Sequence, residues 1–226
     1  ETAAKLDTML ERSRSVAADA SHHLRTPLAA MRLRLETIAD TADNENTATQ
    51  AEAALVEVDR LTRRVDQVLA IATAETEAET IVVDVGESAH LRALDWQGLA
   101  SDRGVDLLCD YVTAPIRAHI GEVERILDEL VGNALDYAES LVKIEVTTGN
   151  ETVHLCVHDD GPGIPQDERE DVFDRFHRGS QSIPGGTGLG LALVRQAAAA
   201  SDGDVRITDT DVGACFEVTW PAVREQ

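Results

Sequence analysis

The amino-terminal third of the sequence carries apolar side chains in a heptad pattern, which restricts this part of the chain to helices that pack side by side. From Leu24 to Ile38 the apolar residues recur at steps of four, three, four and three, the spacing of a helix seam in a bundle. The polar residues 39–47 suit a turn. A second series with alternating steps of three and four runs from Ala51 to Ala72. The sequence therefore predicts a helical hairpin.

A single hairpin cannot bury an apolar stripe that runs along both of its helices. Two copies that pack their stripes together form a four-helix bundle, and for this reason we expect a homodimer. A free-standing antiparallel hairpin is the alternative.

The heptad pattern ends in an acidic segment, and the residues after it predict a different kind of domain. We expect residues 1–74 to form the helical hairpin, 75–79 to be a linker or hinge, and 80–226 to form a second domain. Strands are predicted at 81–85, 105–110, 116–120, 141–148, 152–157, 204–208 and 214–219, and helices at 86–103, 122–137 and 189–200. The fold class is therefore α+β and multidomain, and the second domain is an α/β sandwich with helices on one face of a largely antiparallel sheet.

The chain is strongly acidic. Its formal net charge is −22, and residues 80–226 hold 27 acidic and 11 basic side chains, a difference of −16. This charge argues against nonspecific binding to nucleic acid or to an anionic membrane surface. An anionic ligand of the second domain would therefore need local hydrogen-bond donors and a metal ion.

No apolar run approaches the ~18 residues of a membrane-spanning helix. The sequence begins at Glu1 rather than Met, and we expect it to be a soluble piece of a longer protein. Its three cysteines, Cys109, Cys156 and Cys215, lie far apart and lack metal-ligand spacing. We expect them to be buried, reduced thiols in strands, as in a protein from a reducing compartment.

A histidine on the first predicted helix is a candidate nucleophile. Each helical residue advances about 100°, so His22 lies roughly 200° from the seam residue Leu24 and points to solvent. Thr26 lies one turn further along the same face. A neutral imidazole nitrogen near pH 7 can act as a nucleophile, although a lone surface histidine is more often only solvated.

One face of a helix in the second domain carries candidate ligand-binding side chains. On the predicted helix 122–137, Glu129, Asn133 and Tyr137 follow one another at steps of four and so share a face. The amide oxygen of Asn133 suits Mg²⁺, which prefers oxygen ligands. An ordinary amphipathic helix with surface acids is the alternative.

The segment that follows the strand 152–157 contains an acid and closely spaced glycines, Asp159-Asp160-Gly161-Pro162-Gly163. A buried carboxylate at Asp159 can accept a hydrogen bond from an amine of a ligand, and glycines let the backbone approach that ligand closely. The same glycines and proline would also produce a plain strand-ending turn.

Residues 172–179 hold two of the three phenylalanines of the chain, Phe173 and Phe176. We expect these two rings to pack a mobile lid. Arg178, in the same segment, carries a guanidinium that can reach a terminal phosphate.

A glycine-rich loop precedes the last predicted helix and consists of Gly186, Thr187, Gly188, Leu189 and Gly190. Backbone N–H groups at the start of a helix bind phosphate groups, and side chains in place of the glycines would block that approach. A dinucleotide-binding fold would place such a loop early, directly after a first strand, whereas here the loop comes late.

The octapeptide Ser21–Leu28 resembles the H-box of bacterial sensor histidine kinases, Ser-His-Glu-Leu-Arg-Thr-Pro-Leu, at seven of eight positions. The four clusters of the second domain resemble, in order, the N, G1, F and G2 boxes of the ATP-binding domain that these kinases share with gyrase and the Hsp90 chaperone. The resemblance covers nearly the whole chain. It implies transfer of the γ-phosphoryl group of Mg-ATP to His22 and then to an aspartate of a response regulator.

The same resemblance implies roles for individual residues. His22 is the phosphoacceptor, His23 stands where a neighbouring acid activates it, and Thr26 positions water for dephosphorylation of the regulator. Glu129 lies at a catalytic position, and Asn133 is the Mg²⁺ ligand. The residues expected to contact ATP are Asn133, Tyr137, Asp159, Gly161, Gly163, Arg178, Gly186, Thr187, Gly188, Leu189 and Gly190, with Asp159 reading the adenine amine.

Three residues depart from the family pattern. His23 replaces a Glu or Asp, Glu129 stands where sensor kinases often have Asn and hydrolysing relatives have a general base, and Asp136 replaces a Lys or Arg that contacts phosphate. Two other functions therefore stay open. One is a phosphatase-dominant sensor with weak kinase activity, and the other is a nucleotide-gated scaffold that transfers no phosphate.

The resemblance also implies the partners. We expect a homodimer formed through the hairpin, docking of a response regulator receiver domain, and no nucleic acid. Contact with a membrane is expected only through segments outside this sequence, which would make the chain the cytoplasmic portion of a bacterial cell-membrane protein.

Overall fold

The computed structural model divides the chain into two compact units, Glu1–Thr76 and Glu77–Gln226. The residues that it describes are 27–39, 41–42, 44, 46–47, 49–51, 53–55, 57–58, 61–62, 80–149, 151–177, 179 and 188–223. Six of the residues selected from the sequence lie outside these ranges: His22, His23, Thr26, Arg178, Gly186 and Thr187.

The described part of the first unit is helical over 27–39 and at the described positions between 46 and 62. The second of these helices starts at a cap, because the backbone N–H and the hydroxyl of Thr47 both donate to Oδ1 of Asn44, each at 2.9 Å. In this single chain Met31, Ile38 and Leu61 remain 54%, 45% and 48% exposed. Part of the predicted seam is thus left uncovered within one chain.

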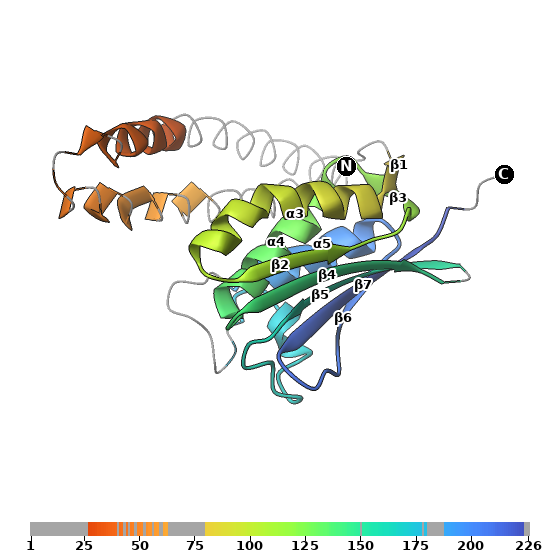
Figure 1. Ribbon diagram of the computed structural model, residues 1–226. Helices are drawn as coiled ribbons and strands as arrows, with labels where there is room; N and C mark the ends of the chain where they lie inside the picture. Colours follow the sequence, from red (N-terminus) through yellow and green to blue (C-terminus); the bar gives the residue numbers. More distant parts are fainter. Residues whose placement is uncertain are drawn as a thin grey trace, which may run out of the picture. The chain divides into compact units, whose positions relative to one another are not determined.

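A five-stranded sheet and three helices make up most of the second unit (Figure 1). The strands in spatial order are β2 (Asp106–Asp110), β4 (Leu141–Thr148), β5 (Thr152–Asp159), β7 (Ala214–Pro221) and β6 (Asp204–Thr208). The helices, which lie on one face of the sheet, are α3 (Val85–Asp102), α4 (Glu122–Tyr137) and α5 (Gly190–Ala200). Only β2 and β4 pair in parallel, and the other neighbours are antiparallel. The predicted fold class is confirmed.

Alternation along the strands separates the two faces of the sheet. In β5, Val153, Leu155 and Val157 are fully buried on the helix side, and the residues between them are half-buried on the other side. The buried stripe of α4, which includes Leu127, Leu130 and Val131, belongs to the same core. Burial of this stripe fixes the rotation of α4 and so determines which of its side chains face away from the core.

A second, two-stranded sheet was not predicted as such. β1 (Thr80–Asp84) pairs antiparallel with β3 (Pro115–His119). Asp84, at the end of β1, caps α3 by accepting hydrogen bonds from the backbone N–H groups of Gly86 at 2.9 Å and Glu87 at 3.3 Å. The same carboxylate oxygen accepts from the N–H of Ala114 at 3.0 Å, and this ties the beginning of α3 to the segment that leads into β3.

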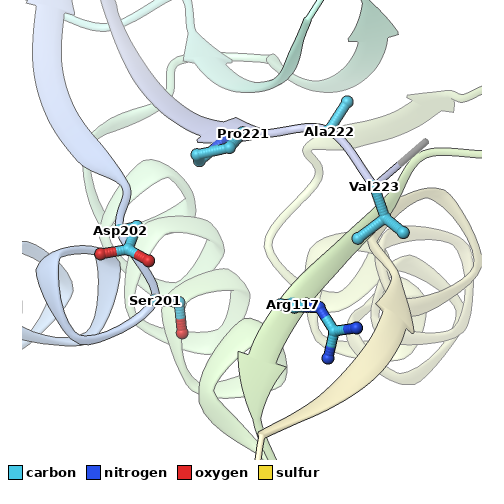
Figure 2. A pocket seen from close by; sticks show the side chains of 6 residues that line it. All are labelled: Arg117, Ser201, Asp202, Pro221, Ala222 and Val223. Carbon is cyan, nitrogen blue, oxygen red and sulfur yellow. The ribbon is translucent and has the colours of Figure 1, made fainter.

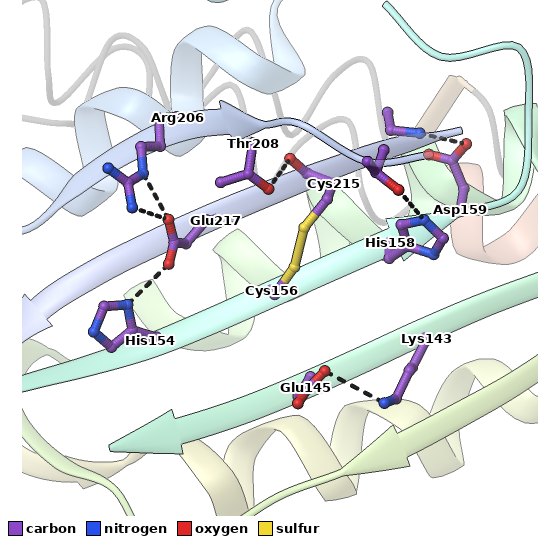
Figure 3. Close-up of a disulfide and its surroundings, with 12 residues drawn as sticks. Lys143, Glu145, His154, Cys156, His158, Asp159, Arg206, Thr208, Cys215 and Glu217 are labelled. Atoms are coloured by element: carbon purple, nitrogen blue, oxygen red, sulfur yellow. Dashed lines mark hydrogen bonds and ion pairs between the residues drawn. A yellow bond between two sulfur atoms is a disulfide. The ribbon is translucent and has the colours of Figure 1, made fainter. Parts of the chain in front are cut away.

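The expectation of three reduced thiols is wrong for two of them. Cys156 of β5 and Cys215 of β7 form a disulfide across the sheet, with a Cα–Cα distance of 6.4 Å (Figure 3). The strand register places Cys156 opposite Glu217 and Cys215 opposite His158, so the bridge runs diagonally. Cys109 is a free thiol, and burial together with the nearby Asp110 raises its pKa.

None of the helices in the described ranges is long and apolar enough to cross a membrane. Within the same ranges, no three His, Cys, Asp or Glu side chains gather in a way that would hold a metal ion.

Candidate nucleotide-binding site

One flank of α4 carries the three residues that the sequence places on a common face. Glu129, Asn133 and Tyr137 are all half-buried, next to the fully buried Leu130 and Ala134 of the core-facing stripe. Within the described residues the side chain of Asn133 makes no hydrogen bond. Its amide oxygen is therefore uncommitted at the edge of the core and can serve as a ligand.

Asp159 ends β5 and is one of three buried polar residues in the described chain, with 3% of its surface exposed. Oδ1 of its carboxylate accepts hydrogen bonds from the N–H of Gly161 at 2.9 Å and the N–H of Ala214 at 3.4 Å. Burial raises the pKa of Asp159 above its usual value, and these two hydrogen bonds oppose the rise only in part. Both bonds go to Oδ1, so Oδ2 has the capacity to accept a hydrogen bond from a ligand.

The glycines after Asp159 permit close backbone contacts. A Cβ atom at Gly161 would collide with the carbonyl oxygen of Tyr137, the last residue of α4. Gly163 has a φ of 75°, and a Cβ atom there would lie 2.7 Å from the carbonyl oxygen of Gly213. The absence of these side chains brings the turn that follows Asp159 directly against the end of α4.

The first turn of α5 follows the described end of the glycine-rich loop. Leu189 is the N-cap residue of the helix, and its apolar side chain makes no capping hydrogen bond to the N–H groups of the first turn. Gly188 has a φ of 67°, and its carbonyl oxygen accepts a hydrogen bond from the N–H of Phe176 at 2.8 Å. A Cβ atom at Gly188 would clash with the backbone of Phe176 and His177. The described end of the glycine-rich loop is therefore bound to the segment around Phe176.

The two phenylalanines of that segment do not share one role. Phe173 is 4% exposed and packs edge-on against Phe216 of β7, with ring centroids 6.3 Å apart. The guanidinium carbon of Arg195 lies 4.6 Å from the centroid of the same ring. Phe176 is 72% exposed and has a positive φ of 66°. Phe173 thus belongs to the core, and only Phe176 is available to a lid.

Asp136 faces away from the core and forms an ion pair with Arg103, with Oδ1 and Nη1 2.7 Å apart. Arg103 is the residue that follows α3. The residue that departs from the kinase pattern at this position therefore joins the ends of two helices.

A shallow cavity lies elsewhere in the second unit, at the C-terminal end of α5 (Figure 2). None of the motif residues lines it. Its walls are formed by Arg117, Ser201, Asp202, Pro221, Ala222 and Val223.

Two family models match segments of the chain, one in each predicted domain. Residues 119–224 match the family described as histidine kinase-, DNA gyrase B-, and HSP90-like ATPase, and residues 12–77 match the His Kinase A (phospho-acceptor) domain. The chain belongs to the histidine kinase family.

Relatives of this chain within the family are longer. The sensor histidine kinase MtrB of Mycolicibacterium paratuberculosis is 34% identical over 223 residues, which are 93% of this chain and 40% of MtrB. The sensor protein RstB of Escherichia coli is 32% identical, over 89% of this chain and 47% of RstB. The chain spans less than half the length of these curated relatives.

Solved structures of histidine kinases share the fold. Full-length ShkA, crystallised in complex with AMPPNP, matches with a TM-score of 0.70 and 25% identity, over 93% of this chain and 46% of ShkA. The mycobacterial sensor histidine kinase MprB matches with a TM-score of 0.57 and 24% identity, over 65% of this chain and all of that chain.

The four clusters selected from the sequence of the second domain contact one another in two pairs. The α4 flank meets the Asp159 turn through Tyr137 and Gly161, and the segment around Phe176 meets the glycine-rich loop through Gly188. α4 also packs against α5. Sequence reasoning gave no role to Asp160, although this residue makes more side-chain hydrogen bonds than Asp159 does. Acid side chains in a turn often accept backbone hydrogen bonds, and this tendency was the signal available in the sequence.

Proposed function

We propose that this chain is the catalytic portion of a sensor histidine kinase, which binds Mg-ATP, phosphorylates His22 and passes the phosphoryl group to an aspartate of a response regulator. The observation that carries the proposal is the buried carboxylate of Asp159, whose Oδ2 is uncommitted beside a turn in which Gly161 and Gly163 carry no side chain. A buried acid of this kind costs stability unless a ligand uses it. The exocyclic amine of adenine is a donor that suits it.

The residues present fit the remaining parts of Mg-ATP. Asn133 would hold Mg²⁺ through its uncommitted amide oxygen, and the N–H groups of the first turn of α5 would hold phosphate oxygens. Mg²⁺ supplies positive charge that offsets the charge of the triphosphate, which the acidic domain would otherwise repel. Tyr137 would close over the nucleotide, and Arg178, Gly186 and Thr187 would complete the phosphate contacts.

The transfer itself moves one phosphoryl group. A ring nitrogen of His22 attacks the γ-phosphorus of ATP, the bond to the β,γ-bridging oxygen breaks, and ADP leaves. The imidazole gives up a proton, which the neighbouring His23 accepts. Positioning and charge neutralisation supply most of the rate enhancement in such reactions. In the second step the phosphohistidine ring takes up a proton on its other nitrogen, an aspartate carboxylate of the regulator attacks the phosphorus, and the N–P bond breaks so that neutral imidazole leaves.

We infer a homodimer from the exposed seam of the first unit. Met31, Ile38 and Leu61 would be covered by the same residues of a second copy, as in a four-helix bundle. The regulator would dock on the face of the bundle that carries His22. The chain would be the cytoplasmic portion of a longer membrane-anchored kinase.

A phosphatase-dominant sensor is the second candidate. Asp136, which pairs with Arg103, brings a carboxylate to the position at which the family resemblance expects a cation for phosphate, and Thr26 keeps the side chain expected to position water. Incubation with phosphorylated regulator would distinguish the two, since a phosphatase-dominant protein removes that phosphate faster than it phosphorylates itself.

The kinase proposal is tested with ATP labelled at the γ-phosphate. We expect label on the wild-type protein that is stable to base and labile to acid, and no label on His22→Gln. Label that persists in His22→Gln, or its absence from wild-type protein that binds Mg-ADP, would overturn the proposal. The second of these outcomes would favour a nucleotide-gated scaffold.

A further inference from the structure

Asp160 anchors the connection between α4 and β4. Its Oδ1 accepts hydrogen bonds from the backbone N–H groups of Glu139 at 2.9 Å, Ser140 at 3.0 Å and Leu141 at 3.0 Å. Its Oδ2 accepts from the hydroxyl of Ser140 at 2.6 Å. A single side chain thus binds three consecutive backbone donors and one hydroxyl.

The connection also binds back to the turn that carries Asp160. The backbone N–H of Asp160 donates to the carbonyl oxygen of Leu141 at 3.2 Å. One residue further on, Gly161 packs directly against the carbonyl oxygen of Tyr137 at the end of α4. The turn after β5 is therefore held against the end of α4 and the start of β4 by backbone contacts as well as by the side chain of Asp160.

Electrostatics indicates that this anchor is charged in the folded protein. Slight burial works against ionisation of Asp160, but hydrogen bonds from Ser140, Leu141 and Glu139 hold the pKa of its carboxyl well below the usual range. The neighbouring Asp159 has a pKa that burial raises. The two adjacent carboxyls thus have opposite environments: Asp159 is buried, and Asp160 accepts hydrogen bonds from the backbone.

We infer that Asp160 is a positioning residue for nucleotide binding, which sets the separation between the adenine-reading Asp159 and the metal-binding flank of α4. This inference rests on the proposed function. Asp159 is covalently next to the anchor. Asn133 lies one helical turn from Tyr137, and the helix transmits the position of its end to that side chain. A ligand that must reach both ends depends on this separation, whereas a ligand that touches only Asp159 does not.

The test compares two ligands on the same variants. Mg-ADP engages both ends of the site, and adenosine engages only the adenine end. We expect Asp160→Ala to raise the Kd of Mg-ADP about tenfold, which corresponds to the loss of one charge-assisted hydrogen bond. The Kd of adenosine should change by less than about twofold. Calorimetry for Mg-ADP and ligand-detected NMR for adenosine give the two constants.

Two further variants control the interpretation. Asp160→Asn keeps an oxygen that accepts from the N–H groups, and the Ser140 hydroxyl can accept from the new amide. We expect the affinity for Mg-ADP to fall only about threefold, with that for adenosine unchanged, because neutral hydrogen bonds are roughly half as strong as charged ones. Asp110→Ala removes a partnered acid from β2, where it pairs with Lys143 at 3.1 Å, and should leave both constants unchanged.

The outcomes separate this inference from the proposed function. Wild-type protein that binds neither ligand would overturn both. Wild-type protein that binds both, with a folded Asp160→Ala that loses neither ligand or loses both by the same factor, would overturn the inference alone. If Asp160→Ala does not fold, the ratio of the two constants in Asp160→Asn decides, and a ratio equal to that of the wild type would refute the inference.

Discussion

Arg103 and Asp136 join the C-terminal ends of α3 and α4 through an ion pair of 2.7 Å. Both side chains are partly exposed, so the pair contributes at most about 1 kcal/mol to the free energy of unfolding. Its larger consequence concerns charge. A carboxylate occupies the position at which the kinase resemblance expects a cation beside the phosphates.

Asp136→Lys should therefore strengthen the kinase reaction. A lysine adds one charge-assisted contact to phosphate, and we expect autophosphorylation at subsaturating Mg-ATP to rise about tenfold. The measurement is the initial rate of phosphohistidine formation. Asp136→Asn is the control, since it breaks the same ion pair without adding a cation, and it should give a smaller gain. Equal rates for the lysine variant and the wild type would show that position 136 does not contact phosphate.

Asp159→Asn should separate stability from binding. Burial raises the pKa of Asp159, so the folded state holds its proton more tightly than the unfolded state, whose pKa is near 3.8. The stability that the protonated carboxyl of Asp159 contributes is thus fully present below the unfolded pKa. It is lost as the pH rises through the higher folded pKa. The variant should be more stable than the wild type at neutral pH, and this advantage should vanish below about pH 4.

Nucleotide binding should respond in the opposite direction. Asn keeps an oxygen for the N–H groups of Gly161 and Ala214 but loses the charged acceptor for adenine, and we expect the Kd of Mg-ADP to rise by about 10- to 100-fold. Urea unfolding at several pH values and calorimetry give the two results. Unchanged affinity in the variant would remove Asp159 from the adenine site.

Reduction of the disulfide should destabilise the second unit. Cys156 and Cys215 are separated by 59 residues in the sequence, and a cross-link of this span stabilises by roughly 2–4 kcal/mol, chiefly by restricting the unfolded chain. Urea unfolding with and without a dithiol reductant measures the difference. Cys156→Ser should abolish that difference and Cys109→Ser should retain it. Equal stability in both redox conditions would mean that the cysteines are unpaired in solution.

The sequence predicted the elements whose signals are local. The bounds of α4, β4 and β6 agree with the structure to the residue, because each has a periodic apolar pattern with turn residues at its ends. The strands 141–148 and 152–157, predicted only three residues apart, pair antiparallel as β4 and β5. The two-stranded sheet of β1 and β3 was missed as a separate sheet, since Asp84 and Ala114 are 30 positions apart in the sequence, and pairing at that distance leaves no periodic trace.

Contacts that depend on strand register also escaped the sequence. The pairing of Cys156 with Cys215 requires the register of β5 and β7, and the anchoring role of Asp160 requires the end of α4 to lie beside the turn after β5. For the candidate site, the motif order identified the buried Asp159 and the α4 flank. It did not indicate that Phe173 belongs to the core or that Asp136 pairs with Arg103.

His23→Glu tests the departure beside the phosphoacceptor. A glutamate can accept the proton of the neighbouring imidazole and adds a negative charge that a neutral histidine lacks. With His23 present, we expect slow autophosphorylation that rises steeply between about pH 6 and 7, where histidines titrate. The glutamate variant should be faster at every pH, by about 10²-fold if the acid acts as a general base, and its profile should be flatter. Rates are measured from initial incorporation of γ-labelled phosphate, with His23→Gln as the control that removes titration without adding a base. An unchanged rate and an unchanged profile in the glutamate variant would show that position 23 takes no part in proton transfer.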